Sequence, residues 1–133
     1  MPKNSPTIPI ERGEFNVYSI RNDSSAIRLI EILDEFGIDY KFFDYRDFPP
    51  SDEQLKKIAD FDGSEYPVNP RNSLFKKSWK VFNKLTEEER FDWFREHYHV
   101  LHRPVIENRE GEILSIDGRP ERIARDLMDI IIK

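Results

Sequence analysis

The sequence predicts an α/β fold in which a four-stranded mixed sheet is covered by helices. The first observation is the succession of an apolar segment, a polar loop, an amphipathic segment and an aromatic-rich segment, which indicates strand, helix and strand. Two strands joined through a helix are usually parallel, so we expect the first two strands to be parallel. The second observation is a turn sequence between two short apolar segments near the C-terminus, which predicts an antiparallel hairpin. A helical insertion is predicted between these two units.

The first predicted strand begins at Phe15 and leads into a helix. Phe15, Val17 and Ile20 show the partial alternation of a buried strand, and residues 22–25 (NDSS) supply side-chain oxygens that can cap helix amides. Gly37 can end the helix in a left-handed conformation. The predicted apolar stripe of the helix consists of Ile27, Ile30, Ile32, Leu33 and Phe36. In α/β proteins, a polar loop between a strand and a helix N-terminus often holds anions or nucleophiles.

The second predicted strand is aromatic and is followed by a proline break. Residues 39–45 (DYKFFDY) form the strand, and Pro49 and Pro50 end it. Ser51 is predicted to cap the next helix. Gln54, three positions later, is predicted to complete a capping box.

The middle of the chain is predicted to be helical. A turn-rich loop over residues 62–70 precedes a helix over residues 72–85, and Thr86 with Glu89 forms a second capping box that opens another helix. Aromatic residues recur at helical spacing in both segments, which favours packing between two helices over a ligand-binding face. They are Phe75, Trp79, Phe82, Phe91, Trp93 and Phe94.

The last part of the chain is predicted to form a hairpin and a helix. Residues 108–112 (NREGE) supply the turn between a strand before them and a strand over residues 113–116. Pro120 is suited to the first position of the final helix. The predicted buried stripe of that helix consists of Ile123, Leu127, Ile130 and Ile131. The predicted order of elements is therefore β-α-β-α-α-α-β-β-α.

Composition limits the classes of function. The 133 residues carry a net charge of −5, and phosphate neutralisation requires a concentrated basic surface, so we expect no direct contact with nucleic acid. No apolar run approaches the roughly 18 residues of a membrane span, so we expect no membrane insertion and a cytoplasmic location. We expect a single domain over residues 14–133, preceded by an extended or flexible arm over residues 1–13.

Cysteine is absent from the sequence, which excludes disulfides, thiol catalysis and thiolate metal sites. His97, His99 and His102 lie close together near the end of a predicted helix, but no carboxylate pattern completes a metal motif. Ser24 and Ser25 are interpreted as helix-capping residues, because no base that would activate them is identifiable. We therefore expect no metal site and no cofactor.

Four segments occur along the chain in this order: VYS with its polar loop and helix, FDYRDFPPSDEQLKKI, HRPVI and DGRPERI. Together they resemble the arsenate reductase (ArsC) and Spx-like family of the thioredoxin fold. VYS with its polar loop and helix resembles the opening strand and active-site loop. FDYRDFPPSDEQLKKI resembles the second strand, the double-proline break and the next helix. HRPVI resembles the Arg-Pro entry into the third strand, where this fold usually has a cis proline, here Pro104. DGRPERI resembles the closing turn and helix, so the resemblance covers about Phe15 to Met128 and implies a thioredoxin-like, glutaredoxin-like fold.

The resemblance places Asp23 at the position of the nucleophilic cysteine of the family's arsenate reductases. Ala26 falls where other members carry the second cysteine of a CxxC pair. A thiolate at a helix N-terminus is stabilised by the local amides and by the helix dipole. An aspartate receives the same stabilisation but forms neither a thiol–arsenic adduct nor a disulfide. We therefore do not expect arsenate reduction by the family mechanism.

The resemblance also implies a set of anion-binding residues, which are Arg71, Arg103, Arg119, Ser24 and Ser25. Arginine suits such a site because its planar fork binds oxyanions through two hydrogen bonds. In one interpretation these groups still bind a small anion. In a second, the Asp23 carboxylate is an internal counter-ion that closes the pocket. In a third, the arginines are ordinary surface residues.

Three classes of function follow from the resemblance. The favoured one is a redox-inactive family member that acts as a protein-interaction or regulatory module. Spx-like proteins bind the C-terminal domain of the RNA polymerase α-subunit, so the resemblance implies that partner. The alternatives are a small-anion or glutathione-binding module and an arsenate reductase-like oxidoreductase that depends on an external thiol.

Overall fold

The computed structural model describes residues 15–63, 66–68 and 72–132. The predicted arm over residues 1–13 and the predicted anion-binding residue Arg71 lie outside this part of the chain. The elements are β1 (Phe15–Ser19), α1 (Ser24–Glu35), β2 (Tyr40–Asp44), α2 (Asp52–Asp62), α3 (Ser73–Phe82), α4 (Glu87–Glu96), the 3-10 turn η1 (Tyr98–Val100), β3 (Val105–Glu107), β4 (Ile113–Ile116) and α5 (Pro120–Ile132). Apart from η1, this is the order predicted from the sequence.

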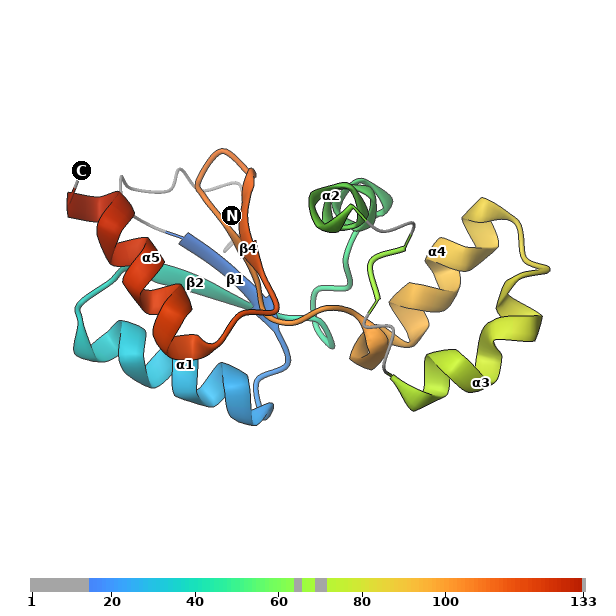
Figure 1. Cartoon of the computed structure of the whole chain (residues 1–133), viewed down its shortest axis with the longest axis horizontal. Helices are drawn as coiled ribbons and strands as arrows, with labels where there is room; N and C mark the ends of the chain where they lie inside the picture. Colours follow the sequence, from blue (N-terminus) through green and yellow to red (C-terminus); the bar gives the residue numbers. More distant parts are fainter. Residues whose placement is uncertain (1–14, 64–65, 69–71, 133) are drawn as a thin grey trace.

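The four strands form one mixed sheet in the order β2-β1-β3-β4 (Figure 1). β1 and β2 are parallel, with Val17 opposite Phe42. β3 is antiparallel to both of its neighbours, and Val105 lies opposite Tyr18 of β1 and Ile116 of β4. The predicted parallel pair and C-terminal hairpin are therefore confirmed.

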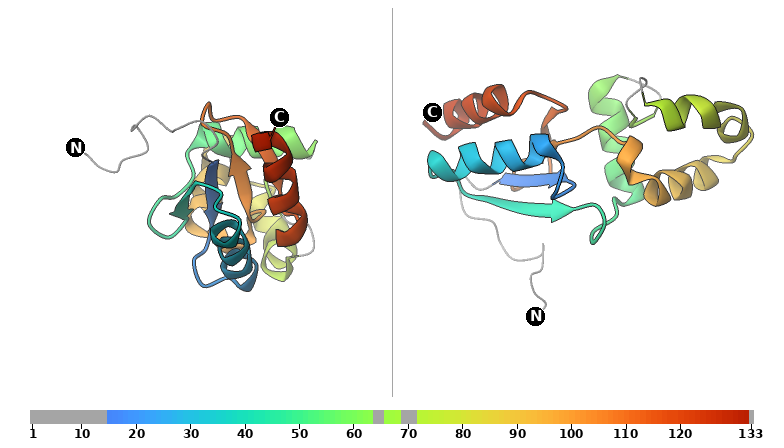
Figure 2. Two further views of the ribbon diagram at one scale, coloured as in Figure 1. Left: turned by 90° about the vertical axis from the view of Figure 1, so that its left-hand side faces the viewer. Right: turned by 90° about the horizontal axis from the view of Figure 1, so that it is seen from below.

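Helices α1 and α5 cover one face of the sheet and lie side by side (Figure 2). Both are amphipathic, and the apolar side chains that they direct inward meet alternate residues of β1 and β3. The core between these layers is largely aliphatic and consists of Phe15, Val17, Leu29, Ile32, Leu33, Ile38, Ile106, Ile123, Ala124 and Leu127.

The helical insertion α3–α4 projects away from the sheet and has its own core (Figure 1). Phe82 and Phe94 are fully buried between the two helices, and the Phe75 ring packs edge-on against the Phe82 ring with centroids 5.4 Å apart. The predicted aromatic packing between two helices is confirmed, although Trp79 is 40% exposed at the edge of the cluster. Tyr45, at the end of β2, joins this cluster to the sheet.

One of the two predicted capping boxes forms completely. The backbone amide of Thr86 donates to the Glu89 carboxylate over 2.8 Å, and the amide of Glu89 donates to the Thr86 hydroxyl over 3.1 Å. At α2, the hydroxyl of Ser51 accepts from the Gln54 amide as predicted. The prediction that the Gln54 side chain completes a box there is wrong, because this side chain is buried and donates to Glu107 instead.

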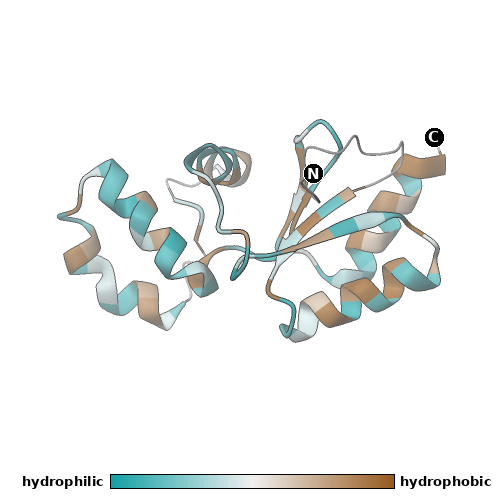
Figure 3. Ribbon diagram, turned by 180° about the vertical axis from the view of Figure 1, so that it is seen from behind, coloured by the Kyte–Doolittle hydropathy of each residue, from teal (hydrophilic) through white to brown (hydrophobic). Residues whose placement is uncertain are grey.

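Two predicted apolar stripes are partly wrong. In α1, Ile27 and Phe36 are 46% and 50% exposed, because the helix packs through the row that begins with Ala26 and Leu29. In α5, Ile130 and Ile131 are 48% and 42% exposed. The last buried residue of α5 is Leu127. The final turn consists of exposed apolar residues, and its ribbon has the hydrophobic colour in Figure 3. Among the described helices, none has the length and apolar character required to cross a membrane.

Candidate functional site

The loop between β1 and α1 lies at the carboxyl end of the parallel strands, and Asp23 caps the helix that follows it. Asp23 has extended backbone angles of φ −70° and ψ 132°, and its carboxylate accepts from the Ser25 amide over 3.3 Å. Its carbonyl accepts from the Ile27 amide over 3.0 Å, which forms the first turn of α1. The carboxylate therefore lies at the positive end of the helix dipole, where negative charge is stabilised.

The second carboxylate oxygen of Asp23 faces Arg103. The distance from Asp23 Oδ2 to Arg103 Nε is 3.4 Å, and each side chain is 23% exposed. β1 and β3 are neighbours in the sheet, so the loop after β1 and the segment before β3 meet at the same edge. The peptide bond between Arg103 and Pro104 is cis. The Nη1 atom of Arg103 is buried and makes no hydrogen bond within the part of the chain that the structure describes.

A second carboxylate, Asp44, attaches the same loop to the end of β2. It is 2% exposed and accepts from the backbone amides of Arg21 and Arg46, each over 2.9 Å. The Arg46 guanidinium also donates to it, with 2.6 Å between Nη2 and Oδ2. The Arg46 guanidinium and the two amides hold the pKa of the Asp44 carboxyl far below its usual range. Sequence reasoning missed this group, although the Asp-x-Arg spacing at a strand end was a signal for it.

Asp23 and Arg103 lie in the wall of a polar cleft of about 220 Å³. The wall consists of Asp23, Ser25, Asn72, His99, Leu101, His102, Arg103 and Asp117. Of the predicted anion-binding residues, the structure brings Ser25 and Arg103 together here.

The other predicted site residues lie elsewhere. Ser24 is the exposed first residue of α1, and Arg119 is exposed just before α5. Neither contributes to the cleft wall among the described residues. Ala26 is fully buried in α1, so the predicted second cysteine position does not face solvent. Ser24, Arg119 and Arg71 thus remain predictions as anion ligands.

The three histidines lie in neighbouring positions, but their rings have different partners. His97 stacks on Trp93 with ring centroids 4.2 Å apart, and His102 is buried with its Nδ1 3.9 Å from a carboxylate oxygen of Asp117. Desolvation, together with the nearby His97 and Arg103, lowers the pKa of His99. Within the described residues, no three His, Asp or Glu side chains are arranged to hold a metal ion.

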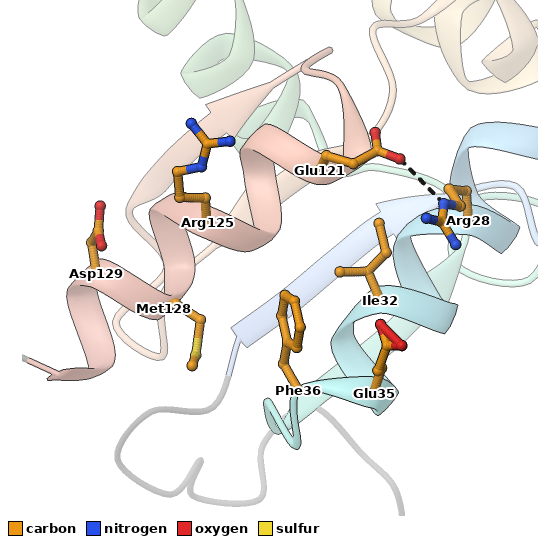
Figure 4. Close-up of a pocket in the computed structure, with 8 residues that line it drawn as sticks. All are labelled: Arg28, Ile32, Glu35, Phe36, Glu121, Arg125, Met128 and Asp129. Atoms are coloured by element: carbon orange, nitrogen blue, oxygen red, sulfur yellow. Dashed lines mark hydrogen bonds and ion pairs between the residues drawn. The ribbon is translucent and has the colours of Figure 1, made fainter.

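A larger groove of about 450 Å³ lies between α1 and α5, away from the cleft wall (Figure 4). Arg28 and Glu121 span the groove with an ion pair of 3.2 Å. Ile32, Phe36 and Met128 form its apolar part, and Phe36 is the half-exposed residue that the sequence predicted to be buried. The groove therefore combines an accessible apolar surface with charged edges.

Asp23 supplies a negative charge at the N-terminus of α1. The helix N-terminus and the Arg103 guanidinium both face this position, and a carboxylate of the chain occupies it. A carboxylate cannot carry out the thiolate chemistry that such a position supports in other proteins. The site therefore contains an ion pair between Asp23 and Arg103, and the sequence supplies no nucleophilic thiol.

No protein-family profile and no curated protein matches the sequence. Solved structures do match it. The arsenate reductase from Vibrio cholerae is 21% identical, with a TM-score of 0.61 over 88% of this chain and 97% of that one. An arsenate reductase (ArsC) related protein from Brucella melitensis is 20% identical, with a TM-score of 0.63 over 87% of this chain and 96% of that one. The YffB protein is 23% identical, with a TM-score of 0.66 over 85% and 98%.

These similarities show a thioredoxin-like fold of the type found in arsenate reductase-related proteins, and they confirm the fold that the sequence resemblance implied. At such identities the similarity establishes the shared fold alone. The chain combines this fold with a sequence that contains no cysteine.

Proposed function

We propose that this protein is a redox-inactive member of the arsenate reductase (ArsC) and Spx-like family, and that it acts in the cytoplasm as a protein-interaction or regulatory module. The observation that carries the proposal is the ion pair between Asp23 at the N-cap of α1 and Arg103 beside the cis proline Pro104. In this proposal, the resemblance of the opening strand, loop and helix to the family places Asp23 at the position of the nucleophilic cysteine. The chain therefore retains the loop and lacks the thiol.

The pair supports the interpretation that the anion pocket is closed by the chain itself. An oxyanion that binds Arg103 would have to displace the Asp23 carboxylate or lie beside it. If it lay beside the carboxylate, the two neighbouring negative charges would repel each other. Asp44 attaches the backbone of the same loop to β2 through the Arg21 amide. These contacts favour a structural role for the pair over the binding of a free anion.

The first partner to test is the C-terminal domain of the RNA polymerase α-subunit, by analogy with Spx-like proteins. The groove between α1 and α5, with half-exposed Phe36, is an accessible apolar surface that suits a protein partner (Figure 4). Direct nucleic-acid binding is not part of the proposal, because the net charge is −5. Calorimetry with the purified domain tests the partner, and Phe36→Ala should weaken any binding that uses this groove.

Phosphate titration followed by NMR tests the closed pocket. In the wild type, we expect no saturable shift of the Ser24, Ser25 and Arg103 amides. Asp23→Ala should open the pocket, so that phosphate shifts the Ser25 and Arg103 signals. Asp60→Ala removes the same charge from an exposed position of α2 and should behave like the wild type. Saturable shifts in the wild type would contradict the closed pocket.

A restored thiol tests the assignment of Asp23. Asp23→Cys should react with iodoacetamide about tenfold faster at neutral pH than Lys80→Cys, because the helix N-terminus and Arg103 stabilise the thiolate. Lys80 is exposed in the last turn of α3 and supplies the unactivated comparison. Equal rates would contradict the assignment.

The alternative function is a small-anion or glutathione-binding module, and one observation favours it. The buried Nη1 atom of Arg103 has no hydrogen-bond partner among the described residues, so the guanidinium retains a donor for a ligand. Binding of glutathione to the wild type would support this function. An arsenate reductase assay with added glutathione tests the third class, and measurable turnover would overturn the non-catalytic proposal.

A further inference from the structure

A second pocket, of about 300 Å³, lies on the face of the sheet opposite α1 and α5. Side chains alternate between the two faces of a strand. Val17 and Ile106 belong to the aliphatic core, so their neighbours Tyr18 and Glu107 point to the other face. Helix α2 lies over that side, and its residue Gln54 contributes to the pocket wall.

The floor of this pocket is the buried carboxylate of Glu107, which has no cationic partner among the residues that the structure describes. Glu107 is 5% exposed. It accepts from the Tyr18 hydroxyl over 3.1 Å, from the Gln54 side-chain amide over 3.3 Å and from the Asn16 side-chain amide over 3.5 Å. All three donors are neutral, and within the described residues no Lys, Arg or His forms an ion pair with Glu107. A buried carboxylate in such surroundings favours an added positive charge, because neutral donors compensate only part of its lost hydration.

The Tyr18 hydroxyl is a stable donor to this carboxylate. Burial and the neighbouring Glu107 charge raise the pKa of Tyr18, so the phenol stays protonated at neutral pH. The single hydrogen of that hydroxyl points to Glu107, and each carboxylate oxygen can accept further hydrogen bonds. The floor therefore retains acceptor capacity toward the pocket.

The ammonium group in the lining of this pocket is hydrogen-bonded to another group. Lys57 lines the same pocket, but its ammonium donates to the carbonyl of Gly111 in the β3–β4 turn over 2.8 Å. Glu53, a second carboxylate, also lines the pocket. The lining thus contains two carboxylates and one ammonium that is already hydrogen-bonded.

Aromatic rings form one side of the pocket. The Tyr18 and Phe43 rings stack with centroids 5.0 Å apart, and Phe48 meets Phe43 edge to face at 5.4 Å. Phe48 is 47% exposed, which places part of its surface within reach of a ligand. Aromatic faces attract ammonium and guanidinium groups through their quadrupole, and they also pack against alkyl chains.

We propose that this pocket binds the ammonium or guanidinium group of an aliphatic cation, which donates to Glu107 while its alkyl chain packs against Phe43 and Phe48. The proposal is independent of the function assigned to the Asp23 loop, since the two sites share no lining residue. A free small amine and the Lys or Arg side chain of a partner protein both carry such a cationic group on an alkyl chain.

NMR titration with agmatine and n-butylamine tests the proposal. Both should shift the Tyr18 and Glu107 amides and the Gln54 side-chain amide in a saturable way. Two further probes separate the contributions of the alkyl chain, the charge and the N–H donors to binding. The first, n-butanol, has the alkyl chain without the charge, and the second, tetramethylammonium, has the charge without N–H donors. Butanol should not bind, and tetramethylammonium should bind more weakly than butylamine. Equal binding of butanol and butylamine would overturn the proposal, as would the absence of binding by both cations.

Matched variants assign the binding to named residues. Glu107→Gln should weaken agmatine binding about tenfold, whereas Glu35→Gln, which removes the same charge from exposed α1, should leave it unchanged. If Glu107→Gln does not fold, Phe48→Ala decides. It should weaken binding about threefold relative to Phe61→Ala, which truncates a similarly exposed ring of α2. Unchanged affinity in both pocket variants would overturn the proposal.

Titration with peptides identifies whether the cation is a free amine or a protein side chain. Peptides with blocked ends and a single central Lys or Arg are titrated beside agmatine. Tighter binding of a peptide than of agmatine would support the proposal with a protein side chain as the ligand. The reverse order would support it with a free amine.

Discussion

The loop at the strand ends and the pocket under α2 both contain carboxylates, but these carboxylates have different partners. At the strand ends, Asp44 accepts from the Arg46 guanidinium at 2.6 Å and Asp23 lies 3.4 Å from the Arg103 guanidinium. In the pocket, the donors to Glu107 within the described part of the chain are neutral, and the shortest of these hydrogen bonds is 3.1 Å, from the Tyr18 hydroxyl. The first region supplies its own positive charge, and the second does not.

This difference separates stability from binding capacity. A carboxylate paired with an arginine and with backbone amides contributes to folding, because the charged form is favoured in the native state. It also leaves less electrostatic attraction for an external ion. A carboxylate held by neutral groups contributes less and retains its attraction for a cation. The comparison therefore predicts large stability effects at the strand ends and small ones at the pocket.

The largest effect is expected from Asp44→Ala. The substitution leaves the Arg21 and Arg46 amides and the Arg46 guanidinium without their acceptor, and we expect a loss of about 3 kcal/mol in the free energy of unfolding. Urea unfolding followed by circular dichroism measures it. Asp47→Ala, an exposed position in the same turn, should change stability by less than about 0.5 kcal/mol. Equal effects of the two substitutions would show that the Asp44 contacts do not stabilise the loop.

The contribution of Asp44 should disappear in acid. Its folded-state pKa lies below the ordinary value of 3.8, so the unfolded chain takes up the proton first as the pH falls. The stabilisation is complete above about pH 5 and is lost progressively as the pH falls through the folded pKa. The stability difference between the wild type and Asp44→Asn should therefore be smaller at about pH 2 than at about pH 7. A difference that does not depend on pH would contradict the charge-based origin of the effect.

A moderate effect is expected from Asp23→Ala. The substitution removes the cap of α1 and the pair with Arg103, and we expect a loss of about 1 kcal/mol, because the pair is partly exposed to solvent. Asp23→Asn retains the capping oxygen and should recover most of this loss. Thermal unfolding of the two variants measures the difference. A larger loss in Asp23→Asn than in Asp23→Ala would contradict the capping role.

The smallest effect is expected from Phe48→Ala. The ring is nearly half exposed and touches Phe43 at one edge, so the free energy of unfolding should change by less than about 0.5 kcal/mol. Chemical denaturation checks this, and it also validates the use of the variant in cation titrations. A loss above about 2 kcal/mol would place Phe48 in the core and remove it from the binding comparison.

Much of the fold could be predicted because its signals are local. Apolar periodicity and capping residues predicted the order of the elements, and the polar loop before α1 identified the strand-end site. The errors arose where a side chain had two competing environments. In the predicted capping box, the Gln54 side-chain oxygen would accept from the Ser51 amide. The side chain is instead buried, and its amide nitrogen donates to the distant Glu107. Phe36 matched the helical stripe and is half exposed, since Ala26 and Leu29 define the face that packs.

The sequence by itself determined the element order, the capping segment over residues 22–25 and the absence of any thiol for family-type chemistry. These properties depend on residue identity and on neighbours within one or two helical turns. The tertiary structure alone decided which polar groups surround Glu107. Tyr18 and Glu107 are 89 residues apart, and Gln54 and Glu107 are 53 apart. Their contact depends on the strand order β2-β1-β3-β4 and on the packing of α2, which no local pattern specifies.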